Sequence, residues 1–96
     1  MKTKLPFNPT HPGEMLLEEF LKPLGISQVD FAKHLGVGFK RINEIVNGKR
    51  SVTPETAWLL SQALGTTPQF WMNLQTTYDL VHHKADHEVK PLKHAG

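Results

Sequence analysis

The sequence contains no cysteine, which excludes disulfide bonds, thiolate nucleophiles and cysteine-based zinc sites. It has no apolar run near the roughly 20 residues that a membrane-spanning helix needs. Its first residues also lack the apolar stretch of a signal peptide. These absences predict a cytoplasmic protein that works in a reducing compartment and has no membrane partner.

Alternating apolar and polar residues, the pattern of a β-strand, do not occur over strand length. Glycine and proline instead divide the chain into five short helical stretches, and a hydrophobic content of 39% is enough for one core. The sequence therefore predicts an all-α five-helix bundle. The helices are expected at residues 13–22, 28–35, 39–46, 54–64 and 68–81, the domain at residues 13–81, an N-terminal arm at residues 1–12 and a polar tail at residues 82–96.

Local signals at the helix ends support this division. Ser27, Thr53 and Thr67 are suited to N-cap positions, and Pro23 is expected to stop or kink the first helix. Only residues 36–38 separate the second and third helices, and the small side chain of Ala32 allows these helices to cross closely. That spacing predicts a helix-turn-helix.

Positive charge is concentrated in one fifth of the chain. Residues 33–50 hold five basic side chains and one acidic side chain, a local charge of +4, whereas the remaining residues have a net charge of −2. A clustered basic segment in a small domain favours a phosphate backbone as partner. The alternative is a charged face in contact only with solvent.

The helix-turn-helix resembles the XRE/Cro family of DNA-binding domains, which have a lambda-repressor-like fold. The shared residues are Gln28, Ala32, Ile42 and those at positions 35–37 and 47–49. Flanking motifs at positions 11–14, 68–71, 74–75 and 78–80 are similar to the HigA branch, also called VapI-like. Members of that branch are antitoxins that repress their own operon and neutralise a HigB-type ribonuclease toxin.

The resemblance implies that the third helix enters the major groove of double-stranded DNA. Its base-edge candidates are Phe39, Lys40, Arg41, Asn43 and Glu44. Arginine and lysine donate to guanine, asparagine pairs with adenine, and glutamate accepts from cytosine. Phosphate contacts are expected from Gln28, Lys49 and Arg50.

Each assignment has a plainer alternative. Gln28 would otherwise be an ordinary exposed residue in a first helical turn, and the loop with Lys49 and Arg50 a solvated turn. Phe39 is expected either to contact a thymine methyl group or to belong to the core. Gly38 stands where family members usually carry Ser or Thr, so a hydroxyl contact from that position is absent.

Related proteins bind inverted-repeat operators as twofold dimers, so a homodimer is expected. The dimer candidates are Leu74, Tyr78 and Val81 at the end of the last helix, although this helix would alternatively only close the core of its own monomer. Leu59 lies almost opposite the inner face of the fourth helix on a helical wheel. It is named as a candidate contact for a second protein.

No catalytic pattern of an enzyme occurs, and no cofactor is expected. His82, His83 and His87 share a predicted helix end, but no further ligand is fixed by spacing, so no metal site is predicted. Three functions remain: a DNA-binding antitoxin, a stand-alone XRE-type regulator without a toxin, and an interaction module that does not bind DNA. The basic cluster speaks against the third.

Overall fold

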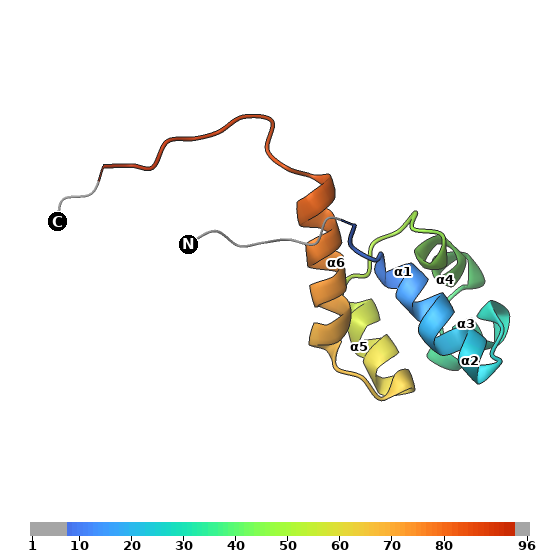
Figure 1. The fold of residues 1–96 in the computed structure, drawn as a ribbon. Coiled ribbons are helices and arrows are strands. Elements are labelled where there is room, and N and C mark those ends of the chain that lie inside the picture. Colours follow the sequence, from blue (N-terminus) through green and yellow to red (C-terminus); the bar gives the residue numbers. More distant parts are fainter. Residues whose placement is uncertain (1–7, 94–96) are drawn as a thin grey trace.

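The computed structural model describes residues 8–93. Its elements are α1 (Pro12–Met15), the π-helical segment η1 (Leu16–Leu21), α2 (Lys22–Leu24), α3 (Gln28–Leu35), α4 (Phe39–Val46), α5 (Pro54–Leu64) and α6 (Pro68–His82). Because α1, η1 and α2 follow one another without a break, the described residues form the five helical segments predicted, with no strand (Figure 1). Residues 1–7 of the expected arm and 94–96 of the expected tail lie outside the described residues.

The first helix is longer than expected, and of the two outcomes expected at Pro23, a stop or a kink, the structure excludes the stop. The helix begins at Pro12 and continues through Pro23 to Leu24, where Gly25 adopts a left-handed conformation with φ 68°. A proline ring disturbs a helix because it clashes with the carbonyl group four residues earlier. The π-helical turns of η1, in which the Lys22 amide bonds to the Leu17 carbonyl, absorb that disturbance.

The predicted N-caps are confirmed. The hydroxyl of Ser27 accepts a 3.0 Å hydrogen bond from the amide of Asp30, and that of Thr67 accepts one of 3.1 Å from Phe70. Thr53 accepts a longer bond of 3.4 Å from Thr56. These hydroxyls satisfy amides that have no partner within their helices, and they fix where α3, α5 and α6 begin.

One hydrophobic core joins the described helices. Its fully buried members include Leu16, Phe31, Ile42, Leu60 and Trp71, which come from η1, α3, α4, α5 and α6. The indole of Trp71 satisfies its own N–H by donating a 2.7 Å hydrogen bond to the hydroxyl of Thr66. Burial of a side chain of this size supplies a large share of the hydrophobic stabilisation, so α6 cannot leave the bundle without opening the core.

The start of α1 is seated directly on the end of α4. A Cβ atom built on Gly13 would lie 1.7 Å from the carbonyl oxygen of Ile45, so only glycine permits this approach. The Nδ1 atom of His11 accepts a 2.9 Å hydrogen bond from the Gly13 amide and caps the helix. The ring of His11 packs edge-on against Tyr78 at a centroid distance of 4.8 Å. His11 and Gly13 therefore fix the position of α1 against both α4 and α6.

The buried side chain of Gln75 joins α6 to the loop after α4. Its Oε1 atom accepts a 2.7 Å hydrogen bond from the amide of Val52, and its Nε2 atom donates to Asp79 at 2.9 Å. A buried amide left without an acceptor costs about 1–3 kcal/mol. Gln75 therefore has a structural role, because it accepts a hydrogen bond from a buried backbone amide in the loop that leads from α4 to α5.

Leu59 is less exposed than a position almost opposite the buried face of α5 suggests. The ridge that α5 exposes is occupied by Trp58, of which 58% is accessible, whereas Leu59 is half-buried and lies beside His34 and Leu35. In α5 the buried positions are Thr56, Ala57, Leu60 and Ser61, so Trp58 and Leu59 lie on either side of the outward face. None of the helices among residues 8–93 is both long and apolar enough to cross a bilayer.

Candidate nucleic-acid interface

Two helices joined by a tight turn form one end of the bundle. Figure 1 shows α3 and α4 side by side, on the side of the molecule away from α6. Gly36 ends α3 with φ 74°, a conformation in which other residues are strained, and the amide of Val37 bonds back to the carbonyl of Ala32 at 3.0 Å. The helix-turn-helix predicted from the spacing is therefore present.

The orientation of α4 follows from its apolar stripe. Ile42 and Ile45 are fully buried, which turns the opposite side of the helix outward. Lys40 is exposed on that side, and Phe39 is exposed at the edge between that side and the buried stripe. Arg41, Asn43 and Glu44 are partly buried at its flanks. All five predicted base-edge residues thus lie on or beside the outward face of α4.

Arg41 is held by the beginning of α5. Its Nη2 atom donates hydrogen bonds to the Oε1 atom of Glu55 at 2.7 Å and to the hydroxyl of Thr56 at 2.6 Å. The Arg41 side chain is 27% accessible. Sequence reasoning missed both partners, because a separation of 14 residues between two helices leaves no periodic signal.

Glu44 and Arg50 form a second internal pair. The Nε and Nη2 atoms of Arg50 donate to one carboxylate oxygen of Glu44 at 3.0 and 2.8 Å. The hydrogen bond from Arg50 holds the pKa of the Glu44 carboxyl below its usual value, with Lys40 and Lys49 adding weaker attraction. The pair fixes the loop after α4 against the helix.

A chain of side-chain amides crosses from α3 to α4. The Nδ2 atom of Asn43 donates to the Oε1 atom of Gln28 at 3.1 Å, and Asn47 donates to the Oδ1 atom of Asn43 at 3.3 Å. The side-chain oxygen of Gln28 is therefore bonded inside the protein. The side-chain NH2 group of Gln28 remains as a hydrogen-bond donor. A phosphate oxygen accepts from such a donor.

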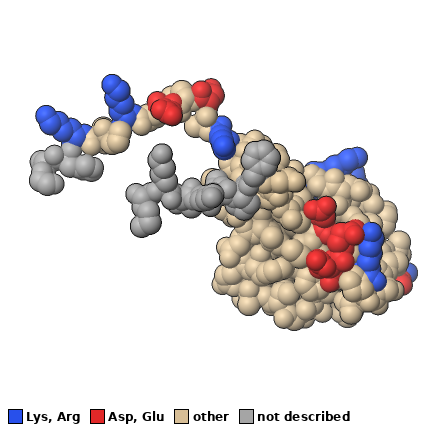
Figure 2. All heavy atoms as spheres, in the orientation of Figure 1, with Lys and Arg blue, Asp and Glu red and all other residues tan. Residues whose placement is uncertain are grey.

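The ion pairs reduce the free positive charge of the basic cluster to three lysines. Within residues 8–93, Lys33, Lys40 and Lys49 form no ion pair, and all three are exposed. Figure 2 shows acidic side chains gathered on the face in view, with a basic side chain beside them, and further basic side chains that project at the upper edge. The three lysines without an ion pair therefore carry the uncompensated positive charge of this end of the bundle.

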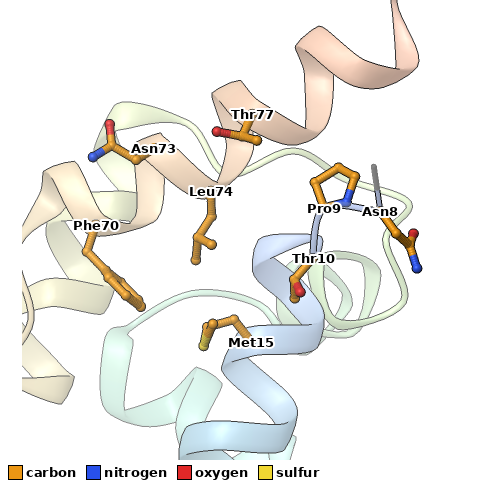
Figure 3. Close-up of a pocket in the computed structure, with 8 residues that line it drawn as sticks. All are labelled: Asn8, Pro9, Thr10, Met15, Phe70, Asn73, Leu74 and Thr77. Atoms are coloured by element: carbon orange, nitrogen blue, oxygen red, sulfur yellow. The ribbon is translucent and has the colours of Figure 1, made fainter. Parts of the chain in front are cut away.

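The dimer candidates are partly used inside the monomer. Leu74 packs against the core and lines a cavity of about 410 Å³ with Met15 and Phe70 (Figure 3). Tyr78 lies between the rings of His11 and His82, at centroid distances of 4.8 and 4.1 Å. Val81 is half-buried near the end of α6.

The histidines after Val81 do not share a helix end as expected. The helix ends at His82, and His87 lies in the extended tail, where it contacts Asp86. No group of three or more ligand-type side chains is placed to hold a metal ion in the part of the chain that the structure describes.

Comparison with known proteins agrees with this architecture. A family model described as helix-turn-helix matches residues 17–71, more than half of the chain. The chain is 51% identical over 70 residues to Virulence-associated protein I of Dichelobacter nodosus, a match over 73% of this chain and 65% of that relative. It thus spans just under two thirds of that protein. It is 42% identical over 72 residues to Antitoxin HigA-1 of Vibrio cholerae, over 75% of this chain and 68% of the relative.

A solved structure gives the same result in three dimensions. The Pseudomonas aeruginosa antitoxin HigA, solved with the higBA promoter, superposes with a TM-score of 0.84 at 38% identity. The match covers 90% of this chain and all of that one. The family consists of DNA-binding regulators and antitoxins, not of enzymes. The chain belongs to the XRE-type helix-turn-helix family, in the branch that contains the HigA antitoxins and the VapI-like virulence-associated proteins.

Proposed function

We propose that this protein is the antitoxin of a type II toxin–antitoxin pair. It binds an inverted-repeat operator in double-stranded DNA as a homodimer, represses its own operon and neutralises a HigB-type ribonuclease. The observation that carries the DNA-binding half is the outward face of α4, where Lys40 is exposed and Asn43 holds the side-chain amide of Gln28. The HigA relative, whose structure contains promoter DNA, supports this use of the face.

In this proposal the side chains divide into two groups. Gln28, Lys49 and Arg50 contact phosphates, which supply affinity and register without sequence information. The base-edge contacts come from α4, through Phe39, Lys40, Arg41, Asn43 and Glu44. Arg41 and Glu44 exchange an internal ion pair for a base contact when they act in this way, so their net contribution is smaller than that of a free side chain.

The homodimer is proposed to form through the end of α6, with Leu74, Tyr78 and Val81. Val81→Asp is the cleanest test, because Leu74 and Tyr78 also pack inside the monomer. Sedimentation of the variant is expected to give a monomer, with weaker operator binding because one half-site is lost. Thr76→Asp adds the same charge at an exposed position of α6 and should remain dimeric. A dimeric Val81→Asp variant would place the interface elsewhere.

Repression and neutralisation are separable by substitution. Lys40→Glu combined with Lys49→Glu reverses two exposed charges and removes no internal hydrogen bond among the described residues. This variant should lose operator binding and still protect cells from the adjacent toxin gene during co-expression. Arg41 and Asn43 are poorer choices, because substituting either also breaks contacts between helices.

Growth and co-purification with the product of the adjacent gene decide between antitoxin and stand-alone regulator. A neighbour that is harmless when expressed alone would favour a stand-alone XRE-type regulator. Failure of the double variant to rescue growth, with its circular dichroism unchanged, would mean that the toxin uses the DNA-binding face. Absence of DNA binding by the unmodified chain would favour an interaction module.

A further inference from the structure

The aromatic ring of Phe39 stands on open surface at the start of α4. It is 47% accessible and is neither part of the hydrophobic core nor among the partly buried residues packed against it. The preceding residue, Gly38, has no side chain, and a Cβ atom built there would meet nothing within 4 Å. A single exposed apolar side chain is common, and Trp58 is exposed as well, but Phe39 is the one that stands on α4, the second helix of the helix-turn-helix.

The polar side chains around Phe39 are already engaged. Arg41 bonds to Glu55 and Thr56 of α5. Asn43 bonds to Gln28 and accepts from Asn47, and Glu44 accepts from Arg50. These bonds restrict how the three side chains can turn toward a base, although each keeps further donors or acceptors. Of the five base-edge candidates, only Phe39 and Lys40 have no internal polar partner in the described part of the chain.

We propose that Phe39 packs against the C5-methyl group of a thymine in the major groove and sets the sequence preference at that base pair. The inference rests on the proposed DNA binding and names the chemical feature that this face recognises. The thymine methyl is the apolar group that a base pair presents in the major groove, and a phenyl ring buries it without any hydrogen bond. The polar base contacts proposed for Arg41, Asn43 and Glu44 lie on the same helix as this apolar contact.

Deoxyuridine isolates the methyl group, because it lacks the C5-methyl and keeps the hydrogen-bonding groups of thymine. The unmodified full-length protein first selects a double-stranded site from random DNA. Each thymine of that site is then replaced singly by deoxyuridine, and affinity is measured by fluorescence anisotropy. One thymine in each half-site should show a loss of about fourfold, the value for returning one buried methyl-sized group to water. Phe39→Ala should bind both duplexes equally.

Two further variants serve as matched controls. Lys40→Ala should bind every duplex more weakly and keep the difference between thymine and deoxyuridine. Phe39→Leu should keep part of that difference, since leucine is also apolar. A duplex with 5-methylcytosine at the same base position should bind the unmodified protein more tightly than one with cytosine. The methyl group of 5-methylcytosine lies at C5, as the methyl group of thymine does. Circular dichroism of Phe39→Ala should match the unmodified protein, since the ring is outside the core.

The outcomes separate this inference from the function on which it rests. If the unmodified protein selects a site but no thymine responds to deoxyuridine, the methyl contact is overturned and DNA binding stands. The contact is equally overturned if Phe39→Ala keeps the full penalty at the same thymine. If the unmodified protein selects no DNA at all, both the inference and the proposed DNA binding fail.

Discussion

Asn43 of α4 donates a 3.1 Å hydrogen bond to the side-chain oxygen of Gln28, the first residue of α3. The bond joins a predicted base contact to a predicted phosphate contact, so neither side chain is oriented independently of the other. It also selects which end of the Gln28 amide remains for DNA. Four consequences of this and related contacts are open to measurement.

The first concerns this hydrogen bond. Gln28→Ala and Asn43→Ala should each weaken operator binding, and the double variant should lose less than the sum, with a coupling energy of about 0.5 kcal/mol or more. The reason is that Asn43→Ala already releases the Gln28 amide from its orientation. A double-mutant cycle by fluorescence anisotropy measures the coupling, with Asn47→Ala paired with Gln28→Ala as a comparison. Strictly additive losses would contradict the prediction.

The second concerns the lysines that have no ion-pair partner among the described residues. Operator affinity should fall steeply with salt, because each neutralised phosphate contributes about −0.9 to the slope of log K against log salt concentration. Lys49→Ala should lower this slope and weaken specific and random DNA alike. Lys84→Ala, beyond the end of α6, is the control and should leave the slope unchanged. A flat salt response would argue against phosphate binding by this face.

The third concerns the contact between α1 and α4. Gly13→Ala should lower the free energy of unfolding by roughly 1–3 kcal/mol, because the added Cβ would overlap the Ile45 carbonyl and force the helices apart. Gly38→Ser is the matched substitution at a site with open space, and its hydroxyl should cap α4 with a gain of a few tenths of a kcal/mol. Urea denaturation of both variants checks the pair. If Gly13→Ala were as stable as Gly38→Ser, α1 and α4 would move apart without a loss of stability, which would contradict the prediction.

The fourth concerns pH. Burial lowers the pKa of His11 below its ordinary value of 6.5, although Asp79 and Glu14 act in the opposite direction. The unfolded chain therefore takes up this proton more readily than the folded chain. The contribution of His11 to stability is complete above pH 6.5 and is lost as the pH falls through the lowered pKa.

The physical reason is that the Nδ1 atom of His11 accepts from the Gly13 amide, which a protonated ring cannot do. Urea denaturation at pH 7.5 and 5.5 should show a loss of stability at the lower pH. His11→Asn, which keeps an acceptor at the cap and does not titrate, should show a smaller loss. The same loss in both proteins would assign the effect to other groups.

The helix order, the caps and the helix-turn-helix were determined by local sequence. Ser27, Thr53 and Thr67 satisfy amides of their own helices, and Gly36 supplies a left-handed residue that ends α3. Such signals act over three or four residues, so they can be recognised in the sequence without knowledge of the tertiary structure. Pro23 was the exception, because it lies within the helix and the sequence pattern did not predict the π-helical segment before it.

Tertiary structure alone decided which side chains are available to a partner. The charge of Arg41 is visible in the sequence, but its bond to Glu55 is not. The exposure of Trp58 and the partial burial of Leu59 depend on which neighbouring segments lie beside each side of α5. Phe39 was equally compatible with core and surface until the packing of α4 placed it outside. Periodicity determines which residues share a helix face, whereas contacts between distant segments determine which of those residues remain free to bind.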